Sequence, residues 1–191
     1  FSLIIVSACT NSEEKKAAQI IQARLLAEQG SSVKSLEILE DLAKEYPNDG
    51  EILSMIGKLY SNIGDLKTAA FFLEQSYLLD EQNVERLYNA YNSLEAAQLP
   101  AAKLLEKLST LGPELMIPQL WVRLGEFRKA ENKVQPALEA YLKGVDASKE
   151  KPQTETATAI GQLFVKIGNL NQAKNWFLMA ASEDDANALT A

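Results

Sequence analysis

Histidine is absent from this chain of 191 residues, and cysteine occurs only once. Without histidine there is no Ser-His or Cys-His nucleophile pair and no imidazole ligand for zinc, and one cysteine cannot form an intramolecular disulfide. Basic residues are also few: 19 Lys and Arg stand against 26 Asp and Glu, a net charge of −7. That balance argues against a surface that binds nucleic-acid phosphates. We therefore expect no catalytic residues, no metal, no cofactor and no nucleic-acid partner.

The residues that are present are typical of a folded chain, since 47% are apolar and 24% are charged. From Ala17 onward the apolar residues recur at helical spacing, and no stretch alternates as a strand does. Marked positions recur every 34 residues, with 36 for the last step: Ala23, Gly57, Tyr91, Gly125 and Gly161. The sequence therefore predicts an all-α chain built from a repeated helical unit.

Small residues within the repeat indicate how its two helices meet. Glycine in the middle of a helix costs about 1 kcal/mol relative to alanine, so Gly57, Gly125 and Gly161 indicate a close approach of helices. Small partners are expected on the second helices, at Ala69, Ala137 and Ala173. Three units have a glycine that is expected to end the first helix, followed directly by a residue suited to cap the second helix: Gly30-Ser31, Gly64-Asp65 and Gly168-Asn169.

Two units show the full pattern most clearly: LSMIGKLY runs from Leu53 to Tyr60, and WVRLG runs from Trp121 to Gly125. These segments resemble the tetratricopeptide repeat, whose 34-residue unit carries W-x2-L-G-x2-Y and then A-x3-F. The resemblance implies a right-handed superhelical solenoid of about five helix-turn-helix repeats. Their expected bounds are 16–49, 50–83, 84–117, 118–153 and 154–187.

The third unit departs from this pattern. Gln98 replaces the turn glycine, Lys103 replaces the small alanine, and Leu111-Gly112-Pro113 is expected to end the second helix early. Proline is tolerated in the first turn of a helix. We therefore place Pro100 and Pro136 in the first turns of second helices, and Pro118 at the start of the fourth unit.

The amino-terminal segment has a different character, because six of the first eight residues are apolar and a polar run follows. Val6-Ser7-Ala8-Cys9 resembles the lipobox of bacterial lipoproteins. The resemblance implies that residues 1–8 are the remnant of a signal peptide, 9–16 a lipidated Cys9 with a short tether, and 17–191 the repeat array. It also implies an outer-membrane location facing the periplasm. The alternative is that residues 1–8 are a buried strand or helix end and Cys9 is a buried thiol.

In the tetratricopeptide family the first helices line a concave groove that binds partners. Carried onto this chain, the resemblance implies a groove of cations, amides and one tyrosine: Arg24, Lys58, Tyr88, Asn89, Asn92, Arg123, Lys129, Gln162 and Lys166. Such a groove suits an extended peptide, including one with acidic side chains or a free carboxyl terminus. The alternative for each charged residue is an ordinary solvated helix face.

The sequence favours a non-enzymatic scaffold for protein–protein interaction. We expect a membrane-anchored bacterial lipoprotein that binds partner proteins or extended peptides for envelope, secretion or pilus assembly. Two alternatives stay open. The repeats could be the docking or regulatory portion of a longer polypeptide with an enzyme or secretion domain beyond residue 191, or the protein could be a soluble co-chaperone.

Overall fold

The computed structural model describes residues 2–188, and the side chains of residues 12–182. Within residues 2–188 the chain is helical and contains no strand. Its elements are α1 (Ser2–Glu28), α2 (Ser32–Glu45), α3 (Gly50–Asn62), α4 (Leu66–Leu78), α5 (Val84–Ala96), α6 (Ala102–Leu111), the 3-10 helix η1 (Pro113–Leu115), α7 (Pro118–Ala130), α8 (Val134–Ser148), α9 (Thr154–Lys166) and α10 (Leu170–Ala188). The predicted all-α fold of helix-turn-helix repeats is confirmed.

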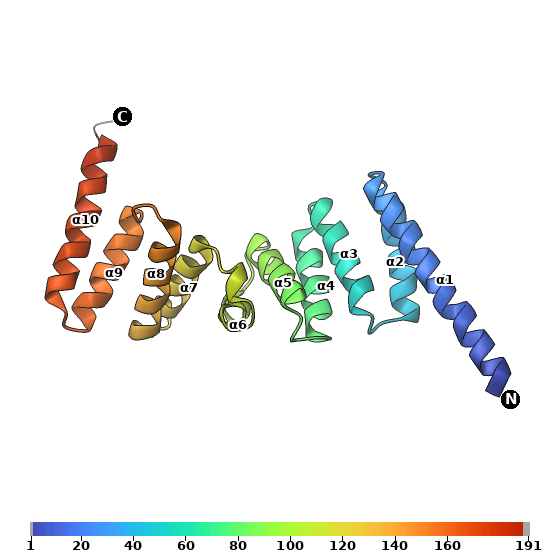
Figure 1. Cartoon of the computed structure of the whole chain (residues 1–191). Coiled ribbons are helices and arrows are strands. Elements are labelled where there is room, and N and C mark those ends of the chain that lie inside the picture. Colours follow the sequence, from blue (N-terminus) through green and yellow to red (C-terminus); the bar gives the residue numbers. More distant parts are fainter. Residues whose placement is uncertain (1, 189–191) are drawn as a thin grey trace. The chain divides into compact units, whose positions relative to one another are not determined.

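The chain forms two compact units, Phe1–Leu104 and Leu105–Ala191. In the first unit α1 packs against α2 and α3 against α4, and the pairs are linked by contacts of α2 with α3 and of α4 with α5 (Figure 1). In the second unit α7 pairs with α8 and α9 with α10, while α8 contacts α9. Each unit is thus a stack of helical hairpins in which neighbours in sequence are neighbours in space.

The mid-helix glycines lie where the two helices of a hairpin meet. A Cβ atom added to Gly57 would lie 2.6 Å from Cγ of Leu73, and one added to Gly125 would lie 2.8 Å from the ring of Tyr141. At Gly161 the nearest atom would be Cε1 of Phe177, at 2.7 Å. Real side chains do not come this close, so the predicted close approach of the paired helices is confirmed.

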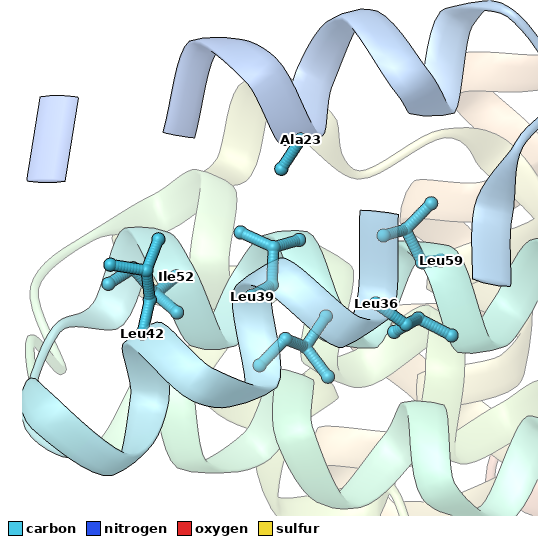
Figure 2. Packing of buried hydrophobic residues seen from close by; sticks show 7 residues of the cluster. Ala23, Leu36, Leu39, Leu42, Ile52 and Leu59 are labelled. Carbon is cyan, nitrogen blue, oxygen red and sulfur yellow. The ribbon is translucent and has the colours of Figure 1, made fainter. Parts of the chain in front are cut away.

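Leucine and isoleucine side chains fill the space between the hairpins of the first unit. Figure 2 shows Leu39 on α2 beneath Ala23 of α1, and both are fully buried. The same cluster contains Leu36, Leu42, Ile52, Ile56 and Leu59. Two buried hydroxyls here are satisfied by backbone carbonyls: Ser35 Oγ donates to Ala23 O at 2.7 Å, and Ser76 Oγ donates to Gly50 O at 2.6 Å. The hydroxyls of Ser35 and Ser76 are therefore both paired.

The turn after each first helix adopts a left-handed backbone at the predicted residues. The φ angles are +77° at Gly30, +85° at Gly64 and +81° at Gly168. Gln98 and Asn132 occupy the corresponding places with φ of 57° and 59°. Gln98 therefore takes over the conformation of the missing glycine, at the steric cost that a Cβ atom brings there.

Two of the three predicted caps form. The side chain of Asp65 accepts a hydrogen bond from the backbone N–H of Thr68 at 3.2 Å, and Asn169 accepts one from that of Gln172 at 3.2 Å. The prediction for Ser31 was wrong, because its side chain makes no cap hydrogen bond. Its ψ of 55° is further from the extended region than the 75° of Asp65, and its hydroxyl is shorter than a carboxylate.

The third repeat is the irregular one, as predicted. Helix α6 has ten residues, ends at Leu111 and is followed by the 3-10 helix at Pro113. The placement of Pro100 was wrong, because α6 begins only at Ala102. The spacing that starts α4 at Leu66 and α8 at Val134 would start α6 at Pro100, so this helix begins two residues late. Pro118 opens α7 and Pro136 lies in the first turn of α8, as expected.

Candidate binding groove

The first helices of the first unit place several predicted residues along one surface. Arg24 lies on α1, Lys58 on α3, and Asn89 with Asn92 on α5. Two adjoining depressions receive these side chains, and they share Lys58 and Asn62. The larger, of about 550 Å³, is lined by Arg24, Ala27, Glu51, Ser54, Met55, Lys58, Leu59, Asn62, Asn83, Glu85 and Arg86. The smaller, of about 230 Å³, is lined by Lys58, Ser61, Asn62, Leu73, Asn89, Asn92, Ser93 and Ala96. We call these depressions together the unit 1 groove.

Two of the three cations of the unit 1 groove, Arg24 and Lys58, face a carboxylate from the next repeat. Arg24 Nη2 lies 2.9 Å from Glu51 Oε1, and Lys58 Nζ lies 3.5 Å from Glu85 Oε1. The acidic partner stands 27 residues after the cation in both pairs. Glu51 and Glu85 each lie in the first turn of a helix, where the helix dipole favours a negative charge. The groove is therefore of mixed charge rather than cationic.

Sequence reasoning missed Glu51 and Glu85, although a signal was present. The two glutamates are 34 residues apart, in register with Arg24 and Lys58. All four side chains are more than half exposed, and such ion pairs contribute at most about 1 kcal/mol. A ligand can therefore exchange with these pairs at little cost.

The other predicted residue of the first unit stands apart. Tyr88 is half-buried on α5 and lines neither depression of the unit 1 groove. Its neighbour Asn89 does line the groove, because consecutive residues of an α-helix point about 100° apart around the helix axis.

In the second unit the predicted cations again have partners. Lys129 Nζ donates to Gln162 Oε1 at 3.0 Å, which brings two predicted residues together, and Lys166 Nζ donates to Asn132 Oδ1 at 3.1 Å. Arg123 pairs with Glu126 at 2.9 Å and lies over the ring of Phe127, 4.7 Å from its centroid. These contacts hold the cationic side chains along the first helices α7 and α9.

A depression of about 440 Å³ in the second unit has an acidic lining. Lys129 is accompanied there by Glu126, Glu155 and the aromatic ring of Tyr141. Burial, with a smaller effect from the nearby charge of Glu126, raises the pKa of Tyr141 to about 12. Glu126 stands at a groove position of the repeat, in register with Lys58 and Asn92, whereas Glu155 comes from a position that sequence reasoning did not select.

The segment of α1 that directly follows Cys9 contacts the residues just after α2. Ser12 Oγ lies 2.9 Å from Tyr46 Oη, and Lys16 Nζ lies 2.8 Å from Asp49 Oδ2 and 4.6 Å from the ring centroid of Tyr46. Burial acts to raise the pKa of Asp49, but the hydrogen bond from Lys16 and those from two backbone N–H groups outweigh it, so the pKa is lowered. The hydrogen bond to Asp49 raises the pKa of Lys16.

The predicted lipidation site, Cys9, lies outside the residues whose side chains are described; its backbone belongs to α1. In the described part of the chain, no helix combines the length and the apolar character needed to cross a membrane. The same residues contain no group of three or more His, Cys, Asp and Glu placed to hold a metal ion.

Residues 50–83 match the family model of the tetratricopeptide repeat. This segment is thus similar to the tetratricopeptide repeat. It coincides with the second predicted unit and contributes α3 and α4, and α3 carries both Glu51 and Lys58 of the unit 1 groove. Helix α3 lies in the middle of the larger depression, whose other lining residues come from α1 and from the start of α5.

Solved structures share the tetratricopeptide-like fold over most of the chain. MamA AMB-1 is 18% identical with a TM-score of 0.64, and the match covers 91% of this chain and 93% of that one. MamA from Desulfovibrio magneticus RS-1, residues 41 to the end, is 20% identical with a TM-score of 0.56, covering 89% and 95%. Similarity at this level shows the fold alone. No curated protein matches the sequence.

Proposed function

We propose that this protein is a non-enzymatic scaffold that binds an extended peptide segment of a partner protein in the unit 1 groove. One observation carries the proposal: Arg24, Lys58, Asn89 and Asn92, from three successive first helices, line two adjoining depressions. Carboxamides both donate and accept hydrogen bonds, as the N–H and C=O groups of an extended peptide require. Rigid helices present these groups along a continuous path.

The ion pairs of the groove suit a segment that carries both charges. An acidic ligand side chain would take over Arg24 from Glu51, and a basic one would take over Glu85 from Lys58. Each exchange replaces one exposed ion pair with another, so the charges fix the position of the peptide along the groove more than they increase its affinity. Apolar contact with Met55 and Leu59 would supply the rest of the binding.

Selection of random peptides displayed on phage tests this function directly. Affinities of the selected peptides would be measured by fluorescence polarisation for the wild type, for Lys58→Glu and for the double variant Asn89→Ala/Asn92→Ala. We expect at least about a tenfold loss in the groove variants, corresponding to about 1.4 kcal/mol. Lys44→Glu is the matched control, because Lys44 is an exposed, ion-paired lysine of the same unit that lies outside the groove.

The selection also has a clear negative result. If no peptide is enriched, or if the groove variants bind the selected peptides as the wild type does, the proposal fails. Helicity from circular dichroism must stay unchanged in each variant, so that a loss of binding reports the groove and not the fold.

We further propose that Cys9 is lipidated and that the protein is held at a bacterial envelope membrane, facing the periplasm, where it recruits proteins of envelope, secretion or pilus assembly. The contacts of Ser12 with Tyr46 and of Lys16 with Asp49 support this arrangement, because they attach the residues beside Cys9 to the first repeat. Fifteen helical residues separate Cys9 from Arg24, about 22 Å at 1.5 Å per residue. The groove would then lie close to the membrane surface.

Metabolic labelling with a fatty-acid analogue tests the anchor. The wild type should be labelled and Cys9→Ser should not, and the variant should move from the membrane fraction to the soluble fraction. Label that persists in Cys9→Ser would exclude this residue as the site.

A second candidate function is the docking portion of a longer polypeptide, and one feature favours it. Phe177 on α10 is 38% exposed, whereas Leu39, Leu73 and Tyr141, at the same place in three of the other repeats, are at most 5% exposed. Leu170 and Leu178 extend this apolar surface of α10. A further helix of the same polypeptide would cover it. Hydrogen exchange of α10 in the natural full-length product, compared with that of the 191-residue chain, tests this. Exchange at the same rate in both would reject the candidate.

A further inference from the structure

Ser93 on α5 is a buried polar residue that the fold does not explain. Its side chain is only 5% exposed, and its hydroxyl has no hydrogen-bond partner among the described residues. The other buried serines of the first unit behave differently, since Ser35 and Ser76 both donate to backbone carbonyls. Leaving a buried hydroxyl unpaired costs free energy, so a residue of this kind calls for a reason.

The repeat pattern shows what Ser93 replaces. The corresponding residues are Leu25, Leu59, Phe127 and, after the longer step, Leu163. Leu59 and Leu163 are 4% and 1% exposed, because their side chains pack against the preceding hairpin. A serine is much smaller than leucine. The space that it leaves is part of the smaller depression of the unit 1 groove, which Ser93 lines together with Leu73.

The lining of this depression is polar and close to neutral. Asn62, Asn89 and Asn92 contribute three carboxamides, and Ser61 adds a second hydroxyl beside that of Ser93. The one charged group is Lys58, and it already faces Glu85. Lys58 is more than half exposed and faces Glu85, so a carboxylate beside the buried Ser93 would lose its water without gaining a cation of its own, which is unfavourable. A neutral carboxamide can instead form paired donor and acceptor bonds with an asparagine side chain.

Resting on the proposed function, we propose that the smaller depression is a specificity pocket for the side-chain carboxamide of a glutamine or asparagine in the bound peptide. When the ligand binds, rotation of the Ser93 side chain about χ1 turns its buried hydroxyl toward the depression, where it donates to the carboxamide oxygen and gains the partner that it lacks in the free protein. Asn89 and Asn92 pair with the remaining donors and acceptors of the ligand. The pocket thereby selects one residue of a segment that the rest of the groove holds through its backbone.

The peptides selected by phage display on the wild type are the probe. We expect them to share glutamine or asparagine at one position, and a change of that residue to glutamate or leucine to weaken binding about tenfold. Ser93→Leu fills the pocket with the side chain of the other repeats and should bind the glutamine, glutamate and leucine forms alike. Ser93→Ala keeps the space and removes the hydroxyl. Its affinity should fall about threefold for the glutamine form of the peptide and stay unchanged for the other two forms.

Three results would overturn the pocket: no shared amide residue among the selected peptides, a preference for glutamate over glutamine, or a glutamine preference that survives in Ser93→Leu. In each of these cases the peptides still bind, so the proposed function stands. If no peptide is enriched on the wild type, the proposed function fails and the pocket fails with it. Circular dichroism and thermal unfolding of both variants show whether a lost preference reflects a lost fold.

Discussion

Replacing Gly57 with alanine probes the contact on which the hairpins depend. In an isolated helix this change is favourable by about 1 kcal/mol, because alanine loses less backbone entropy on folding. In the folded chain the added methyl group would lie 2.6 Å from Leu73 Cγ and 3.1 Å from the carbonyl oxygen of Ala69. The leucine can rotate, but the backbone oxygen moves only if α3 and α4 separate.

The magnitude follows from these opposing effects. Overpacking of a well-packed interior costs about 1–3 kcal/mol. Set against the gain of about 1 kcal/mol in helix propensity, this predicts that Gly57→Ala lowers the free energy of unfolding by about 1 kcal/mol. Urea unfolding followed by circular dichroism measures it. The double variant Gly57→Ala/Leu73→Ala removes the side-chain part of the clash and should show a favourable coupling energy in a double-mutant cycle.

Gly161→Ala is the matched control in the same protein. The three atoms nearest to its methyl group would all belong to the ring of Phe177, and Phe177 is 38% exposed and can turn toward solvent. We therefore expect Gly161→Ala to be neutral or stabilising by up to about 1 kcal/mol. If Gly57→Ala were as stable as Gly161→Ala or more so, the argument from close helix approach would be refuted.

Three further predictions concern a cap, a turn and a buried phenol. Asp49→Ala should lower the free energy of unfolding by about 1–2 kcal/mol and Asp49→Asn by less, because asparagine keeps the cap on α3 and loses only the pair with Lys16. Since the pKa of Asp49 is lowered, the stability difference between Asp49→Asn and wild type should be present above pH 3.8 and disappear as the pH falls below it. Thermal unfolding across that pH range measures this difference. Gln98→Gly should raise the melting temperature, because it relieves a left-handed residue at φ 57° by about 1 kcal/mol, whereas Gln98→Ala should not; equal melting temperatures would contradict the strain. Because the pKa of Tyr141 is raised to about 12, its contribution to stability is complete below pH 10 and is lost as the pH rises toward 12. In an ultraviolet titration one phenol should ionise last and be missing from Tyr141→Phe, and an unchanged titration in that variant would contradict the assignment.

The sequence alone determined the repeat and the contacts inside it. The glycines at 57, 125 and 161 and the turn residues at 30, 64, 98 and 168 could be assigned because a hairpin stack keeps sequence neighbours in contact. A spacing of 34 residues then translates directly into a place in the structure. Two predictions failed, the first-turn position of Pro100 and the cap at Ser31, because the exact start of a helix and the geometry of its cap depend on local backbone conformation and not on the repeat spacing.

Only the tertiary structure decided the character of the candidate groove. Arg24 and Lys58 could be placed on first helices from their spacing, but their pairing with Glu51 and Glu85 depends on how the next repeat is positioned. Ser93 is visible in the sequence as a departure from leucine, yet its unpaired hydroxyl and the depression beside it exist only once α3, α4 and α5 are packed. Periodicity assigns a residue to a face of its own helix, whereas charge pairing and cavities arise from atoms that different repeats bring together.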